Sequence, residues 1–296
     1  MKFFPESATS QLEFDKIKSL LADHCQTEYA KYKALNLRIH TKKEFIEPQL
    51  QQTNEYKLLL QNNLSFPSGD VFNLSKELKL LSIAGAVLKS EDFLQIKKLA
   101  ENIKQIFRWF HNERKLAYPA LNNVISNTYF EKIIIELIDE VLDENGIVKD
   151  SASEELANIR SSLYNKRNEL RRIFDRIISR MNKQGYLADI EESFMNGRRV
   201  LAVFAEQKRM VKGILHGESD SRRTTFIEPE ETTDLNNQIF SLENDERKEV
   251  YKILQALTAK LHVYVSLLQT YHDILGEFDF IKAKAKLAID INANYP

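Results

Sequence analysis

Two long stretches of the sequence carry apolar residues at steps of three and four, the spacing of one face of an α-helix. The first runs from Ser151 to about Gln184, and the second begins at Pro229 and meets no glycine before Gly276. We call the row of apolar residues on one face of each stretch its seam. The first seam consists of Leu156, Ile159, Leu163, Leu170, Ile173, Ile177 and Met181. The second consists of Leu235, Ile239, Leu242, Val250, Ile253, Leu257, Leu261, Tyr264, Leu268 and Leu275. Seams this long and narrow predict two helices paired as a long antiparallel coiled-coil arm.

Turn-forming residues are scarce in the rest of the chain as well. Only 8 glycines and 6 prolines occur among 296 residues, well below their average use in globular proteins. A β-sandwich or barrel needs many turns, so the composition favours a mainly α fold. Before residue 145, helical stretches are predicted at 11–37, 44–61, 74–84, 90–110 and 129–142.

The helical pattern changes between the two long seams. Asn196-Gly197 separates two extended runs, 190–195 and 199–205, and this dipeptide is the strongest short signal for a β-hairpin. Further extended runs follow at 210–216 and 224–227. We therefore predict a small antiparallel β-sheet at the end of the arm.

These patterns divide the chain into four segments. Residues 1–150 are a helical core domain, and residues 151–186 are the ascending helix, for which Ser151-Ala-Ser-Glu154 has the spacing of a capping box. Residues 187–228 form the sheet. Residues 229–296 are the descending helix and its return to the core, with a last helical stretch at 278–289.

The sequence offers no catalytic motif. No glycine is followed by lysine, which excludes a phosphate-binding P-loop, and the six histidines are scattered. The single cysteine, Cys25, excludes a disulfide framework and a multi-thiolate zinc site, and a lone thiol beside His24 is typical of a small core residue. We expect no catalytic residue, no metal site and no cofactor within these residues.

No targeting or membrane signal is visible either. The N-terminus MKFFPESATSQ lacks the apolar core and cleavage site of a secretory signal, and no apolar run approaches 18 residues. These observations predict a cytoplasmic protein with no membrane partner.

The charge distribution points to one class of ligand. The whole chain has a net charge of −1, but residues 160–223 hold fifteen Lys and Arg against eight Asp and Glu, while residues 228–250 hold eight acids against two bases. We expect most cations of 160–183 to pair with the acidic helix. The basic residues of the sheet and its turns lie beyond that helix, and guanidinium groups suit phosphate. The predicted nucleic-acid-binding residues are Arg198, Arg199, Lys208, Arg209, Lys212, Arg222 and Arg223.

Three aromatic residues alternate with this basic set: Phe194, Phe204 and Phe226. Their pattern favours packing in the core of the small sheet over stacking on bases. Because no base-reading motif is visible, any contact with nucleic acid is expected to be sequence-independent and strongly dependent on salt.

Several blocks of sequence resemble the MutS family, and in particular its second bacterial, Smr-associated branch, which is linked to suppression of recombination and to rescue of collided ribosomes. The most specific blocks are 197–206 (GRRVLAVFAE), 211–216 (VKGILH), 225–229 (TFIEP) and 235–237 (LNN). Residues 12–17, 25–28 and 143–156 (DENGIVKDSASEEL) also resemble that branch. The resemblance extends over nearly the whole chain.

The resemblance implies a core and lever region with a clamp inserted at the lever tip. In that family, paired clamps of a homodimer close around double-stranded DNA in mismatch repair. It further implies that a P-loop ATPase domain, with ATP and Mg²⁺, follows the levers; the chain ends at Asn294-Tyr-Pro296, about where that domain would begin. Three roles stay open: a clamp on duplex or branched DNA, a ribosome-associated clamp that meets ribosomal RNA, and a coiled-coil scaffold for protein partners.

The chain departs from the branch at one turn. Where relatives have Gly-Ala-Thr before Phe-Ile-Glu-Pro, this sequence has Arg222-Arg-Thr-Thr225. The two arginines add positive charge to the loop. They also raise the question whether its backbone follows the same path as in that branch.

Overall fold

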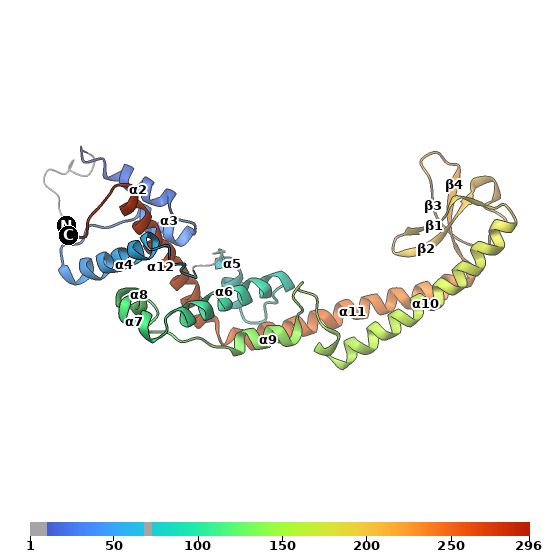
Figure 1. The fold of residues 1–296 in the computed structure, drawn as a ribbon. Coiled ribbons are helices and arrows are strands. Elements are labelled where there is room, and N and C mark those ends of the chain that lie inside the picture. Colours follow the sequence, from blue (N-terminus) through green and yellow to red (C-terminus); the bar gives the residue numbers. More distant parts are fainter. Residues whose placement is uncertain (1–10, 68–72) are drawn as a thin grey trace. The chain divides into compact units, whose positions relative to one another are not determined.

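The computed structural model describes residues 11–67 and 73–296 (Figure 1). Residues 1–10, the segment searched for a secretory signal, and residues 68–72 lie outside that range. The described chain is mainly helical and contains a small antiparallel sheet, which confirms the predicted fold class at this level. It divides into two compact units: unit 1 comprises Met1–Ile147 and Leu254–Pro296, and unit 2 comprises Val148–Ile253.

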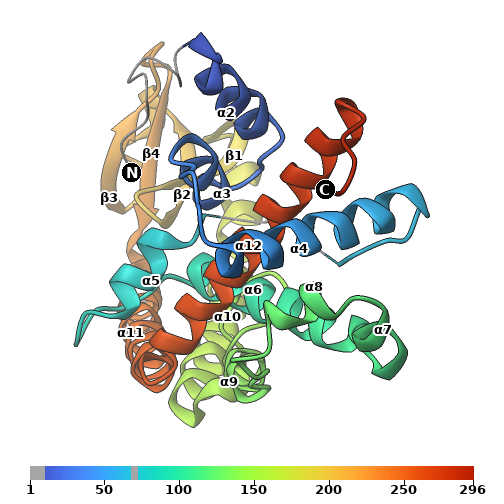
Figure 2. The ribbon, with the colours of Figure 1, turned by 90° about the vertical axis from the view of Figure 1, so that its left-hand side faces the viewer.

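Unit 1 is built from helices. It includes the end of the long helix α11 (Glu230–His262), from Leu254 onward. Its helices are α2 (Phe14–Asp23), α3 (Glu28–Leu35), α4 (Lys43–Gln61), α5 (Ser75–Leu81), α6 (Ser90–Trp109), α7 (Asn112–Ala117), α8 (Pro119–Asn123), α9 (Ile133–Val141) and α12 (Val265–Asp290). Figure 2 shows α12 running beside α4, and α12 also contacts α3 and α6. Helix α12 is therefore the element around which unit 1 packs.

An aromatic cluster fills the core of unit 1. The ring of Phe66 lies 4.7 Å from that of Phe278 on α12, 5.0 Å from Trp109 on α6 and 5.6 Å from Tyr56 on α4. Tilted and edge-to-face pairs at such distances add to the free energy gained by burying the rings.

Helices α3 and α12 approach closely at Gly276. A β-carbon at this position would lie 2.5 Å from Cδ1 of Tyr29. One turn later, Oδ2 of the buried Asp279 accepts hydrogen bonds from the backbone N–H groups of Gln26 (2.9 Å) and Thr27 (2.7 Å). Because the first N–H groups of a helix lack partners within it, this carboxylate anchors the start of α3 to α12.

The lone thiol has the core environment that the sequence indicated. Cys25 is buried, and its Sγ donates to the carbonyl oxygen of Leu21 at 3.3 Å. Burial, with the nearby charge of Asp279, raises the pKa of the thiol to about 12. A thiol with so high a pKa is not a nucleophile at neutral pH.

The second long seam is not one continuous helix. Helix α11 (Glu230–His262) ends well before Gly276, and α12 begins at Val265. Tyr264 N–H donates to the carbonyl of Leu261 (2.9 Å), which closes a turn, and Nδ1 of His262 lies 2.8 Å from the carbonyl oxygen of Leu81. No glycine or proline marks this break, and the contact between His262 and Leu81 lies at the end of α11.

Unit 2 contains two long helices and the sheet. The helices are α10 (Glu154–Lys183) and α11, and the strands are β1 (Leu187–Met195), β2 (Arg198–Phe204), β3 (Gly213–Glu218) and β4 (Thr224–Pro229). Ser153 and not Ser151 caps α10: its Oγ accepts from Leu156 N–H at 3.0 Å and donates to Glu249 of α11 at 2.9 Å. A single-turn 3₁₀ helix at Asp150–Ala152 displaces the predicted capping box.

The strands form one antiparallel sheet in the order β1-β2-β4-β3. Asn196 and Gly197 join β1 to β2, and both have left-handed φ angles (51° and 77°). Such a pair is what a two-residue turn between antiparallel strands requires. The predicted hairpin is therefore present, and Met195 pairs with Arg198 across the turn.

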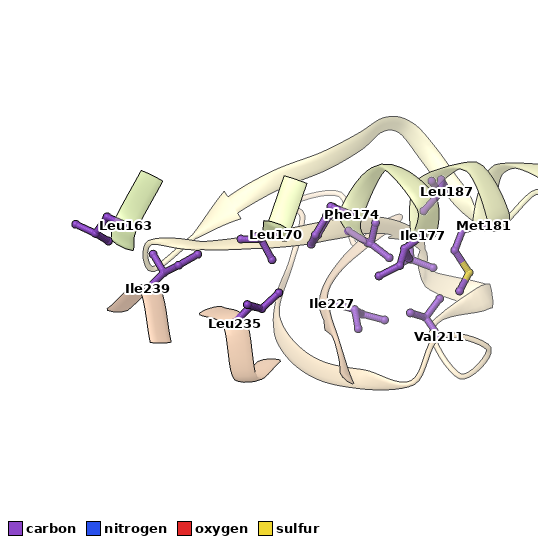
Figure 3. Packing of buried hydrophobic residues seen from close by; sticks show 12 residues of the cluster. Leu163, Leu170, Phe174, Ile177, Met181, Leu187, Val211, Ile227, Leu235 and Ile239 are labelled. Carbon is purple, nitrogen blue, oxygen red and sulfur yellow. The ribbon is translucent and has the colours of Figure 1, made fainter. Parts of the chain in front are cut away.

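One apolar cluster joins the sheet to both long helices (Figure 3). Phe174 and Ile177 of α10 and Leu235 and Ile239 of α11 pack with strand residues such as Ile227. Each fully buried side chain of this kind contributes about 1.5–3 kcal/mol of transfer free energy. The sheet is thus held on the helix pair by a shared core.

In residues 11–67 and 73–296, none of the helices combines the length and the apolar character that crossing a membrane requires.

We predict that Gly276→Ala destabilises the protein, although alanine is the better helix former by about 1 kcal/mol. The added methyl group collides with the ring of Tyr29, and overpacking of this kind costs about 1–3 kcal/mol. Urea unfolding measures the change. The control is Thr270→Ala on the exposed face of the same helix, which should be neutral; an equal or higher stability of the glycine variant would contradict the close approach.

Candidate nucleic-acid interface

Four of the seven predicted residues gather at one end of the sheet. The segment after β2 and the turn before β4 lie side by side there, because Phe204 pairs with Thr224 and Ala205 N–H donates to the carbonyl of Arg223 at 2.9 Å. We call these four residues the distal basic cluster: Lys208, Arg209, Arg222 and Arg223.

The cluster is open to solvent. All four side chains are exposed. Lys208 pairs with Glu218 at 3.2 Å, but no ion pair neutralises Arg209, Arg222 or Arg223 among the described residues. Three guanidinium groups at one end of a sheet thus keep their full hydrogen-bonding capacity for a ligand.

Arg222 keeps the backbone path that a glycine would favour. Its φ angle is +56°, in the left-handed region, which costs a residue with a β-carbon roughly 1–2 kcal/mol. The hydrogen bond from Arg222 N–H to the Ser219 carbonyl (2.8 Å) holds this turn. The turn thus places arginine in the left-handed conformation that glycine adopts without strain.

Lys212 lies at the opposite end of the sheet. It precedes β3, where Gly213 pairs with Pro229, and its carbonyl accepts from Glu230 N–H (3.1 Å) at the start of α11. Its side chain is exposed, and it lies three residues after Arg209, on the segment that leads from the distal basic cluster to the start of β3.

Arg198 is bound within the sheet. Its Nη1 donates to both carboxylate oxygens of Glu228 (2.8 and 3.1 Å), and its Nη2 donates to Oδ1 of Asn237 (2.5 Å). Glu228 is fully buried and also bonds to Nε2 of His216 (2.7 Å) and to Nδ2 of Asn236 (2.9 Å). This carboxylate therefore connects β2, β3 and α11 to its own strand.

Arg199 is also engaged inside unit 2. Its Nε donates to Glu192 at 2.6 Å, and its Nη2 lies 3.7 Å from Asp175 of α10. The guanidinium carbon lies 4.7 Å from the ring centroid of Phe174, and the side chain is only 13% exposed. The structure thus divides the seven residues into five exposed cations and two that are paired internally; that the seven bind nucleic acid stays a prediction.

Helix α10 carries cations that the sequence analysis had assigned to pairing across the helices. Three pairs with α11 confirm part of that expectation: Arg160–Glu246 (2.7 Å), Arg167–Glu243 (2.7 Å) and Arg180–Glu231 (2.5 Å). Four other cations are exposed and have no ion pair within the described chain: Arg171 and the three that follow it along the helix, Arg172, Arg176 and Lys183. At 100° per residue these three point away from the apolar seam; we call them the α10 stripe.

The expectation for the phenylalanines is wrong at Phe194. Its side chain is 69% exposed, and that of Phe204 is 39% exposed, whereas Phe226 is partly buried. Phe194 lies on β1, an edge strand whose pairing with β2 is irregular between Leu187 and Glu192. The ring therefore lies near the free end of the hairpin, where the core does not cover it.

Within the residues that the structure describes, no group of three His, Cys, Asp or Glu side chains is placed to hold a metal ion.

Comparison with known proteins identifies the family. The chain is 31% identical over 97% of its length to a curated protein from Aquifex aeolicus, and 32% identical over 96% to one from Staphylococcus haemolyticus; both are named endonuclease MutS2. A Geobacillus protein of the same name is 30% identical over 96% of the chain. No family model matches. The chain belongs to the MutS2 branch of the MutS family. It spans only 37%, 37% and 36% of the length of these three relatives.

We predict that Glu228→Gln lowers the free energy of unfolding by about 2–4 kcal/mol, because it leaves Arg198 without its counter-charge in a largely buried site. Thermal or urea unfolding checks the change. The matched control is Glu218→Gln, which breaks the exposed pair with Lys208 and should cost at most about 0.5 kcal/mol. Equal effects of the two variants would show that the buried network is not important for stability.

We also predict that Arg222→Gly is more stable than Arg222→Ala, by about 1 kcal/mol. Both variants remove the guanidinium group, but only glycine relieves the left-handed strain. Paired urea titrations give the difference, and an alanine variant as stable as the glycine variant would argue against the left-handed turn.

Proposed function

We propose that unit 2 binds double-stranded or branched DNA through contacts to the phosphate backbone, as the clamp (residues 187–228) of a MutS-type protein of DNA repair and recombination suppression. The observation that carries this proposal is the distal basic cluster, where Arg209, Arg222 and Arg223 are exposed and have no ion-pair partner in the part of the chain that the structure describes. The two N–H groups of a guanidinium group can bond to two oxygens of one phosphate, and such contacts do not depend on the base sequence of the DNA.

The strain at Arg222 supports the same role. Arg222 costs stability in the folded chain, and such a residue is retained more readily where its side chain meets a ligand. Glycine would satisfy the backbone at this turn, but it would not supply a positive charge.

The charge pattern of the long helices supports a role for α10. The acids of α11 neutralise Arg160, Arg167 and Arg180. The cations of the α10 stripe have no ion pair among the described residues. A cation without a carboxylate partner attracts phosphate more strongly than one already paired, because no salt bridge must be broken first.

We further propose that α10 and α11 act as the coiled-coil lever that carries the clamp. Their seams share a core with the sheet, so a movement of the helices is transmitted to the basic turns. The cleavage named for the relatives, ATP and Mg²⁺ binding, and the homodimer implied by the resemblance are proposed for the longer proteins. To the chain itself we assign binding.

We predict that Arg222→Ala combined with Arg223→Ala weakens binding to duplex DNA without lowering thermal stability. Loss of two phosphate contacts should reduce the slope of log K against log salt by about 2. Fluorescence anisotropy with a labelled duplex, a four-way junction and a structured ribosomal RNA fragment, each across a salt series, measures both affinity and slope.

The matched control is Arg247→Ala combined with Lys248→Ala, which removes two neighbouring charges from the exposed surface of α11. It should leave the salt slope for DNA unchanged. Tighter binding of the RNA than of either DNA would favour the ribosome-associated role instead, and absence of binding to all three nucleic acids at low salt would favour a scaffold for protein partners.

A further inference from the structure

A groove in unit 2 lies between the β1–β2 hairpin and the two long helices. Its volume is about 620 Å³, within the usual range for small-ligand sites. The residues that matter for its chemistry are Leu170, Ile239, Phe194, Arg171, Asn168 and Asn236. They come from α10, α11 and β1; of these residues, the sequence pattern raised base stacking only for Phe194, and there it favoured core packing.

One wall of the groove is an open aromatic ring. Phe194 pairs directly with Arg199 across the hairpin, so the two side chains lie on the same face of the sheet. Arg199 packs on Phe174 of α10, which identifies that face as the one toward the helices. Phe194 is nevertheless 69% exposed, so its ring borders the groove without being covered by the core.

The floor is apolar, and the charged lining residues are three arginines and two glutamates: Arg167, Arg171, Arg199, Glu192 and Glu243. Leu170 and Ile239 are buried members of the shared core. Arg171 on α10 is exposed and has no ion pair among the residues described, whereas Arg167 nearby is neutralised by Glu243. The groove therefore offers an aromatic face, an apolar base and one uncommitted guanidinium group.

We propose that this groove receives an unpaired nucleotide of the bound DNA, with its base against Phe194 and its phosphate at Arg171. Stacking on an exposed aromatic side chain is how proteins hold unstacked bases, and it tolerates any base. The amide of Asn168 lines the same groove, and amide groups match the donors and acceptors of base edges; the amide of Asn236, which also lines it, is buried and donates to Glu228. The preferred DNA is accordingly one that contains a bulge, gap or branch.

This inference rests on the proposed function, and it adds a distinction between two kinds of contact. The distal basic cluster grips phosphates and should not distinguish paired from unpaired DNA. The groove should contribute only when a base is free to leave the helix.

The test compares a fully paired duplex with the same duplex carrying a single bulged 2-aminopurine, with the 296-residue chain in both titrations. We expect the bulged duplex to bind about tenfold more tightly, and the fluorescence of the 2-aminopurine to change as the base exchanges its neighbours in the duplex for Phe194. Phe194→Ala should abolish the tenfold preference and the fluorescence change, and leave affinity for the paired duplex unaltered.

Two control variants separate the contacts. Phe204→Ala removes an exposed phenylalanine that does not line the groove and should preserve the preference. The Arg222→Ala, Arg223→Ala double variant should weaken binding to both DNAs by the same factor.

Equal affinities for the two DNAs in the unmodified chain would overturn this inference and leave the proposed function standing. Absence of binding to either DNA would overturn both. A loss of polyglutamate binding in Phe194→Ala, with the bulge preference intact, would reassign the groove to an acidic peptide.

Discussion

The buried carboxylate of Glu228 is the interaction on which the geometry of unit 2 depends. It sits on the last strand, two residues before α11 begins, and bonds to Arg198, His216 and Asn236. These partners come from β2, β3 and α11. An ionised group without water must find charged or polar partners, so this single side chain sets how the sheet meets the helix that follows it.

The same requirement explains how the basic residues of unit 2 are divided. Where a carboxylate is within reach, as for Arg198, Arg199 and the three cross-helix pairs, the cation is part of the structure. Where the chain forms turns beyond the acidic helix, no carboxylate of residues 11–67 and 73–296 neutralises Arg209, Arg222 or Arg223. A chain with almost no net charge thus presents local positive surfaces, and those surfaces carry the proposed contacts with phosphate.

Local sequence was a good guide wherever the physical cause is local. Asn196-Gly197 turns between two strands because both residues adopt left-handed angles, and the apolar period of α10 places its seam in the core. It was a poor guide at the break after His262, which no glycine or proline marks and where His262 contacts Leu81 of another helix. It was equally poor at the cap of α10, because Ser153 also bonds to Glu249, 96 residues away in sequence.

The candidate site likewise combines features that local sequence predicts with features that depend on tertiary contacts. The sequence alone determined that the chain is mainly helical with a small antiparallel sheet, because periodicity and turn residues act over a few positions. It also located the basic residues of the sheet. Only the tertiary structure decided which of them are free, since Arg198 and Arg199 meet their carboxylates through the fold, and only it revealed that Phe194 borders a groove. Burial and pairing depend on neighbours distant in sequence, and those neighbours are chosen when the sheet packs on the two helices.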